Sequence, residues 1–169
     1  MKFSYDFKLS EHSGSSRVYV CGDITARIDF LSGSMMRVAL FRDDCKMLPT
    51  FTVDPQNEFL TEGRDKLSLD GFSLFAPQVN ATADGERFSL GNVEAELNTH
   101  NFVLSYKKDG KLLFADRAPL AYNFQNEFGN GTYHYLTREK GEKIYGLGDK
   151  GGSVNKAGRT FRIETSDSM

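Results

Sequence analysis

The chain has 169 residues, of which 39% are hydrophobic, and this length fits one domain with a sizeable core. Its formal net charge of −2 gives no electrostatic footprint for nucleic acid or for an anionic membrane surface. Because no apolar run approaches about 18 residues and residues 1–6 lack an apolar signal core, we expect a cytoplasmic protein without a membrane or nucleic-acid partner.

Hydrophobic residues recur along the chain with a period of two, which is the pattern of strands with one buried face. In the clearest case, Ala26, Ile28 and Phe30 fall on one face and alternate with Arg27 and Asp29. Segments of this kind, bounded by Gly, Asp or Asn, predict strands at 17–21, 26–30, 36–41, 50–53, 66–69, 72–75, 87–90, 93–97, 102–106, 112–114, 132–136 and 158–163.

The turns between these segments predict antiparallel neighbours. Asp109-Gly110 supplies the positive φ angles of a type I′ turn and predicts a hairpin between 102–106 and 112–114. Residues 118–132, rich in Asn and Gly, predict a long loop. No long stretch shows a helical stripe, so the pattern predicts an all-β fold, either an antiparallel β-sandwich or a barrel.

Cysteine and histidine are too sparse to predict a metal site. Two cysteines, Cys21 and Cys45, are too few for a disulfide framework, and we expect both to be buried, reduced thiols. His12, His100 and His134 are widely spaced and match no zinc-ligand pattern. We therefore expect neither a bound metal nor a cofactor.

One glycine motif invites a nucleotide interpretation. Residues 146–151, Gly-Leu-Gly-Asp-Lys-Gly, fit the dinucleotide fingerprint G-x-G-x-x-G literally. That fingerprint needs a helix immediately afterwards. The glycines at 151, 152 and 158 disfavour a helix there, so we interpret the motif as a turn in an all-β chain.

The same region resembles a known family. The resemblance is carried by three segments: Tyr145-Gly146-Leu147-Gly148-Asp149-Lys150, then Val154-Asn155-Lys156-Ala157-Gly158, then a strand ending in Thr165-Ser166-Asp167. This region is similar to the end of the N-terminal β-sandwich domain of glycoside hydrolase family 31. The domain has the galactose mutarotase-like superfold, and the family includes α-glucosidases and α-xylosidases.

The chain departs from the family pattern at three places. The family usually has Glu where this chain has Asp149, and a second basic residue where it has Ala157. Residues 164–167 read Glu-Thr-Ser-Asp where the family has Trp-Asn-x-Asp. Tyr145, the motif glycines and Asp167 match, whereas the Trp-Asn pair does not.

The resemblance implies a domain that precedes a catalytic (β/α)₈ barrel. The family's nucleophile motif, Trp-x-Asp-Met-Asn, is absent from these residues, which are also too few for a barrel of about 250 residues. We therefore expect residues 1–169 to form a single accessory domain, inert alone, with the barrel following residue 169. The expected partners are that barrel and an α-linked oligosaccharide.

The resemblance also assigns roles to residues. Asp167 corresponds to a carboxylate that hydrogen-bonds sugar hydroxyls at the rim of the active site, a role that suits a charged acceptor. We expect Tyr145 to act as an aromatic plug, and Gly146 and Gly148 to form a tight turn. An isolated domain is expected to expose an apolar patch where the barrel docks, and it can homo-oligomerise through that patch.

Two other functions fit an all-β chain. One is a free-standing carbohydrate-binding sandwich, although the absence of Trp removes its commonest binding platform. The other is an aldose epimerase-like enzyme, which needs a His and a Glu converging in a cleft. His100 and His134 are available for this chemistry, but the sequence pairs neither with a carboxylate.

Overall fold

The computed structural model describes residues 4–32, 35–51, 61–124, 131–148 and 151–162, and in these ranges it contains strands and loops but no helix. The chain divides into two compact units, Met1–Thr137 and Arg138–Met169. All strands of the described residues belong to the first unit. The prediction of one domain over 1–169 stays a prediction.

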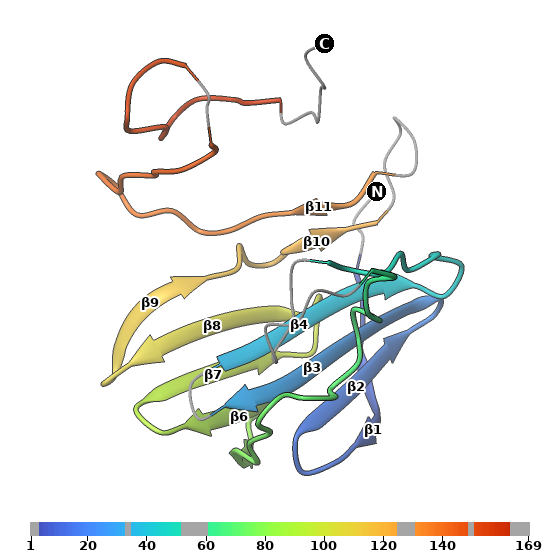
Figure 1. Ribbon diagram of the computed structural model, residues 1–169. Coiled ribbons are helices and arrows are strands. Elements are labelled where there is room, and N and C mark those ends of the chain that lie inside the picture. The colour runs from blue at the N-terminus through green and yellow to red at the C-terminus, as the bar shows by residue number, and fades with distance from the viewer. Residues whose placement is uncertain (1–3, 33–34, 52–60, 125–130, 149–150, 163–169) are drawn as a thin grey trace. The chain divides into compact units, whose positions relative to one another are not determined.

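The first unit contains two antiparallel sheets in which each strand pairs with its neighbour in the sequence (Figure 1). The first sheet is formed by β1 (Lys8–His12), β2 (Ser16–Cys21), β3 (Ile24–Ser32) and β4 (Met35–Arg42). The second sheet is formed by β5 (Gln78–Ala81), β6 (Gly85–Leu90), β7 (Val93–Asn98), β8 (Val103–Lys108) and β9 (Lys111–Ala115). A separate pair consists of β10 (Tyr122–Asn123) and β11 (Tyr133–His134).

The core lies between the two sheets. Ala26, Ile28 and Phe30 of β3 are buried on one face, as the alternation predicts. The ring of Phe30 packs against that of Phe88 in β6, with 5.2 Å between the ring centroids. Aromatic contacts of this kind join the sheets face to face. The all-β, antiparallel sandwich predicted from the sequence is thus confirmed.

The hairpin predicted between 102–106 and 112–114 is present. Asp109 and Gly110 have φ angles of 50° and 75°, as a type I′ turn requires, and they join β8 to β9. The connection from β7 to β8 also uses positive φ, at Asn101 (63°) and Phe102 (51°). Phe102 is fully buried, so core packing holds this residue in a backbone conformation that it rarely adopts.

Three predicted strands are wrong within the described residues. Segments 66–69 and 72–75 form turns and irregular chain, and 158–162 continues a turn without pairing. At 66–68, contacts with the side chain of Arg37 explain why no strand forms. Its guanidinium donates hydrogen bonds to the carbonyl oxygens of Lys66, Leu67 and Ser68, so these groups are not available for a ladder.

Other elements differ from the prediction more mildly. Of segment 50–53, Thr50 makes an isolated bridge to Arg64, and residues 52–53 lie outside the described residues. The edge strands β1 and β5 were not predicted, because their sequences are polar and lack a hydrophobic alternation. The predicted loop 118–132 contains β10, whose partner β11 falls in the predicted strand 132–136.

A glycine on β6 is required by close packing of the backbone. A Cβ added at Gly85 would overlap the carbonyl oxygen of Leu97 on β7. We expect Gly85→Ala to lower the free energy of unfolding by about 2–3 kcal/mol, because the backbone ladder must shift. Urea denaturation of this variant and of the wild type measures the change.

The matched control is Gly14→Ala. Its Cβ would lie 3.8 Å from the Cβ of Ala76, which is an ordinary contact. We expect this variant to change the free energy of unfolding by less than about 0.5 kcal/mol. Equal stabilities of the two variants would contradict the steric argument for Gly85.

Candidate functional site

The segment that carries the family resemblance forms a turn in the second unit. Gly146, Leu147 and Gly148 all have positive φ angles, of 114°, 69° and 60°. The tight turn expected from the glycines is therefore present, and no helix follows it in residues 151–162. Gly158 also has a positive φ, of 74°. The side chain of Tyr145 is 60% exposed, so this ring does not plug the unit itself.

Asn155 and Lys156 close this segment into a loop. The Oδ1 atom of Asn155 accepts hydrogen bonds from the backbone N–H groups of Ile144 (3.0 Å) and Ala157 (3.1 Å). The N–H of Lys156 donates to the carbonyl of Ile144 at 2.7 Å. Lys156 is only 8% exposed, and its ammonium lies 5.6 Å from the ring centroid of Phe161.

The Asn155 amide should hold this loop closed. We expect Asn155→Ala to speed hydrogen exchange at the Ile144 and Ala157 amides by about 5- to 10-fold, because each loses a hydrogen bond worth about 1 kcal/mol. Exchange measured by NMR tests this, with Asn80→Ala, an exposed position on β5, as the control. Unchanged exchange at both amides would refute the bridging role.

The residue predicted to contact sugar, Asp167, lies outside the described residues, as does Asp149 of the glycine motif. The structure therefore leaves the role of Asp167 as a prediction. Among the described residues, Tyr145, Gly146, Gly148 and Gly158 all belong to the same unit, Arg138–Met169.

A histidine–carboxylate pair in which the carboxylate is buried lies in the first unit, and the sequence did not reveal it. The Nε2 atom of His134 on β11 lies 2.8 Å from the Oδ1 atom of Asp116. The other oxygen of Asp116, Oδ2, accepts a hydrogen bond from the backbone N–H of Leu104 on β8. Asp116 is only 4% exposed. The imidazole ring stacks on Tyr122 of β10, with centroids 4.2 Å apart and planes at 7°.

Both residues of this pair line a cavity of about 380 Å³, which is also lined by residues of β4, β8 and β9. The described residues that line it are Met36, Val38, Leu40, Tyr106, Phe114, Asp116, Tyr122, Thr132 and His134. Burial, together with the nearby Asp116 carboxylate, raises the pKa of the Tyr106 and Tyr122 hydroxyls well above the usual range. Both tyrosines are therefore neutral at physiological pH.

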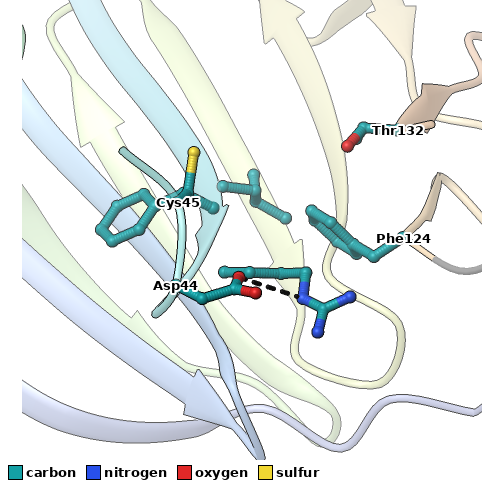
Figure 2. Close-up of a pocket in the computed structure, with 7 residues that line it drawn as sticks. Asp44, Cys45, Phe124 and Thr132 are labelled. Carbon is teal, nitrogen blue, oxygen red and sulfur yellow. Dashed lines mark ion pairs between the residues drawn. The ribbon is translucent and has the colours of Figure 1, made fainter. Parts of the chain in front are cut away.

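A second cavity, of about 350 Å³, lies beside the end of β4 (Figure 2). Asp44 and Cys45 lie on one side of it, and Phe124 and Thr132 lie opposite. The guanidinium of Arg42 pairs with Asp23 at 3.0 Å and with Asp44 at 3.5 Å. Because two carboxylates neutralise this arginine, the cavity offers little attraction for an anion.

The predicted burial of the cysteines is wrong, although both are free thiols. Cys45 is exposed, and Cys21 is half-buried. Cys45 follows the end of β4, where the chain leaves the sheet, and Cys21 ends β2 beside a turn. Neither position lies deep between the two sheets.

His100 belongs to a second histidine cluster, which lies at the surface. The Nδ1 atom of His100 lies 2.6 Å from the Oδ1 atom of Asp6, and its Nε2 atom lies 3.5 Å from the Oγ of Ser4. The order resembles a serine–histidine–aspartate relay, but the Asp6 side chain is 73% exposed. Catalytic relays depend on a buried, oriented carboxylate, so we assign no activity to these three residues.

Among the described residues, no three or more histidine, cysteine, aspartate or glutamate side chains are placed to hold a metal ion. Within the same residues, no helix is long and apolar enough to cross a membrane.

The fold and its loops define a galactose mutarotase-like β-sandwich, and comparison with known proteins identifies the family. The model of the glycosyl hydrolase 31 N-terminal galactose mutarotase-like domain matches residues 25–169. This chain belongs to that family. No curated protein matches the chain.

Solved structures agree in fold. A family 31 dextranase of Flavobacterium johnsoniae, a mutant in complex with isomaltotriose, aligns with a TM-score of 0.62 and 20% identity. The same dextranase in complex with glucose aligns with a TM-score of 0.59 and 21% identity. Each alignment covers 90% of this chain and 18% of the dextranase, so the chain spans less than a fifth of the length of that enzyme.

Proposed function

We propose that this chain is the N-terminal accessory domain of a retaining family 31 α-glycosidase, with α-glucosidase activity in the parent enzyme. The observation that carries the proposal is the family match over residues 25–169. In this proposal the domain packs on the catalytic (β/α)₈ barrel of the same parent chain and is inert alone. Family membership favours this function over a free-standing binding module or an aldose epimerase-like enzyme.

Exposed apolar side chains support the packing role. In the second unit, Tyr145 is 60% exposed and Val154 is 76% exposed, and Ile144 and Leu147 are exposed as well. In the first unit, Leu112 and Leu113 on β9 are exposed. Apolar groups gathered on a surface favour a protein interface. We propose that the barrel covers them, and that homo-oligomerisation occurs where no barrel is present.

The second part of the proposal concerns the sugar site. Residues 145–167 lend a loop to the rim of the barrel's active site, and Asp167 accepts hydrogen bonds from hydroxyls of an α-linked oligosaccharide. The support is the family pattern, in which an aspartate ends this segment. A dextranase of the family is described in complexes with isomaltotriose and with glucose, which makes α-glucosides the first substrates to test. A cytoplasmic location is part of the same proposal.

The test begins with the coding sequence beyond Met169. If it continues into a barrel with Trp-x-Asp-Met-Asn, both lengths are assayed on p-nitrophenyl α-glucoside, p-nitrophenyl α-xyloside and isomaltotriose. We expect hydrolysis by the long form only, with α-glucoside preferred over α-xyloside. A stop codon after Met169, or hydrolysis by the 169-residue chain alone, would overturn the accessory-domain proposal. Preference for the xyloside would overturn the α-glucosidase assignment only.

A further inference from the structure

We propose that the cavity around His134 and Asp116 binds one neutral pyranose within the sandwich. All its described lining residues belong to the unit Met1–Thr137. Its volume of about 380 Å³ falls in the range of small-molecule pockets. Such pockets combine apolar and aromatic walls with a few oriented polar groups, and this one has both.

Aromatic rings form one wall of the cavity. Tyr106 on β8 and Phe114 on β9 stack with centroids 4.3 Å apart and planes at 23°. Phe114 is 47% exposed, so part of its surface is open to a ligand. Met36, Val38 and Leu40 of β4 add an aliphatic lining. A pyranose has an apolar face of C–H groups, which a surface of this composition can cover while the ring edge stays polar.

The polar end is held rigidly. Asp116 is fixed through Oδ2 by the Leu104 N–H, and its Oδ1 accepts the hydrogen bond that His134 makes with Nε2. When Nε2 carries the proton, the Nδ1 atom of a neutral imidazole is an acceptor. The His134 side chain is 42% exposed, so the ring can be reached by a ligand hydroxyl. The hydroxyls of Tyr106 and Tyr122, both lining residues, can donate to or accept from further sugar hydroxyls.

The charge of the cavity favours a neutral ligand. Asp116 is buried at the polar end, and its field contributes to the raised pKa of both tyrosines. The negative charge of Asp116 would repel an anionic ligand, whereas the hydroxyl groups of a neutral sugar would find hydrogen-bond donors and acceptors. The cavity should therefore distinguish a neutral pyranoside from the corresponding uronic acid.

The test is a titration of the ¹⁵N-labelled 169-residue chain with methyl α-D-glucopyranoside, followed by NMR. We expect saturable shifts at residues of β8, β9, β10 and β11 that line the cavity, with a dissociation constant in the millimolar range. Methyl α-D-glucopyranosiduronate is expected to bind about 10-fold more weakly. No shift at the cavity with methyl α-D-glucopyranoside up to about 0.1 M, which is about a hundredfold above a dissociation constant of about 1 mM, would overturn the proposal.

Two variants connect the shifts to the cavity. Tyr122→Phe removes one hydroxyl and keeps the ring stacked on His134, and we expect about 3- to 10-fold weaker binding. His134→Gln retains a donor for Asp116 but removes the ring acceptor, and we expect about 5- to 10-fold weaker binding. His12→Gln replaces an exposed histidine outside the cavity and should leave binding unchanged.

Each variant is first checked by its NMR spectrum, so that only folded chains are compared. Wild-type affinity in both folded variants, or shifts confined to residues outside the cavity, would show that the sugar binds elsewhere and overturn the proposal. Because the titration uses the 169-residue chain and measures binding, its failure is independent of whether a longer form hydrolyses α-glucosides.

Discussion

Replacing Asp167 with Asn in the intact parent enzyme is expected to lower kcat/KM for an α-glucoside by about 10- to 150-fold. Asn keeps the shape of the side chain but removes its charge. A hydrogen bond to a charged group contributes about 1.5–3 kcal/mol, and about 1.4 kcal/mol corresponds to a factor of ten. Initial rates on p-nitrophenyl α-glucoside measure the loss. This prediction depends on the proposed barrel and on the family pattern that ends at Asp167.

The matched control for this variant is Asp109→Asn. Asp109 lies in the type I′ turn after β8, at a φ of 50°, and Asn is well suited to that conformation. We expect the control to keep the wild-type kcat/KM and thermal midpoint. If Asp167→Asn stays within twofold of the wild type, the residue has no sugar contact. A loss of kcat/KM accompanied by a lower midpoint would place the effect in stability instead.

Local periodicity predicted the sandwich well because its core strands expose one face and bury the other. The alternation of Ala26, Ile28 and Phe30 predicted β3, and Asp109-Gly110 predicted the hairpin of β8 and β9. Both signals are confined to a few neighbouring residues. The prediction failed at 66–69, where the pattern is equally regular. Arg37, about 30 positions earlier, binds the carbonyl groups there, and no local pattern can encode that contact.

The candidate site was predicted less completely for the same reason. The glycines predicted the turn at 146–148, because positive φ is a property of single residues. The pairing of His134 with Asp116 requires the β10–β11 pair to fold back beside the end of β9. In the sequence these two residues are separated by a segment that resembles an ordinary polar loop. The hydrogen bonds of Asn155 likewise depend on how the loop closes.

A buried charge network on β3 was also invisible to the pattern, which placed Asp29 on the polar face of an alternating strand. The carboxylate of Asp29 is fully buried. Its Oδ1 accepts hydrogen bonds from Ser16 Oγ (2.6 Å) and Arg27 Nε (2.8 Å). Its Oδ2 accepts from the Nε (3.0 Å) and Nη2 (2.7 Å) of Arg37. Through Arg37, the same carboxylate orients the guanidinium that holds the carbonyls of 66–68.

Removal of this carboxylate is expected to be the most destabilising substitution considered for the domain. We expect Asp29→Ala to lower the free energy of unfolding by about 3 kcal/mol, near the lower end for breaking a buried ion pair, because Arg27 and Arg37 are partly exposed and can be rehydrated. Loss of the charge also releases Arg37. The amides of 66–70 should therefore exchange faster in the variant than in the wild type, and this increase should be larger than any increase at β6 and β7. Urea denaturation and hydrogen exchange measure the two effects.

The comparison that isolates burial is Asp44→Ala. Asp44 also pairs with an arginine, at 3.5 Å from Arg42, but its side chain is 77% exposed. A solvent-exposed ion pair contributes little, so this variant should change the free energy of unfolding by less than about 1 kcal/mol. If Asp29→Ala is no more destabilising than Asp44→Ala, water reaches the carboxylate of Asp29 in solution. The segment 66–68 would then be held by contacts other than the Asp29–Arg37 pair.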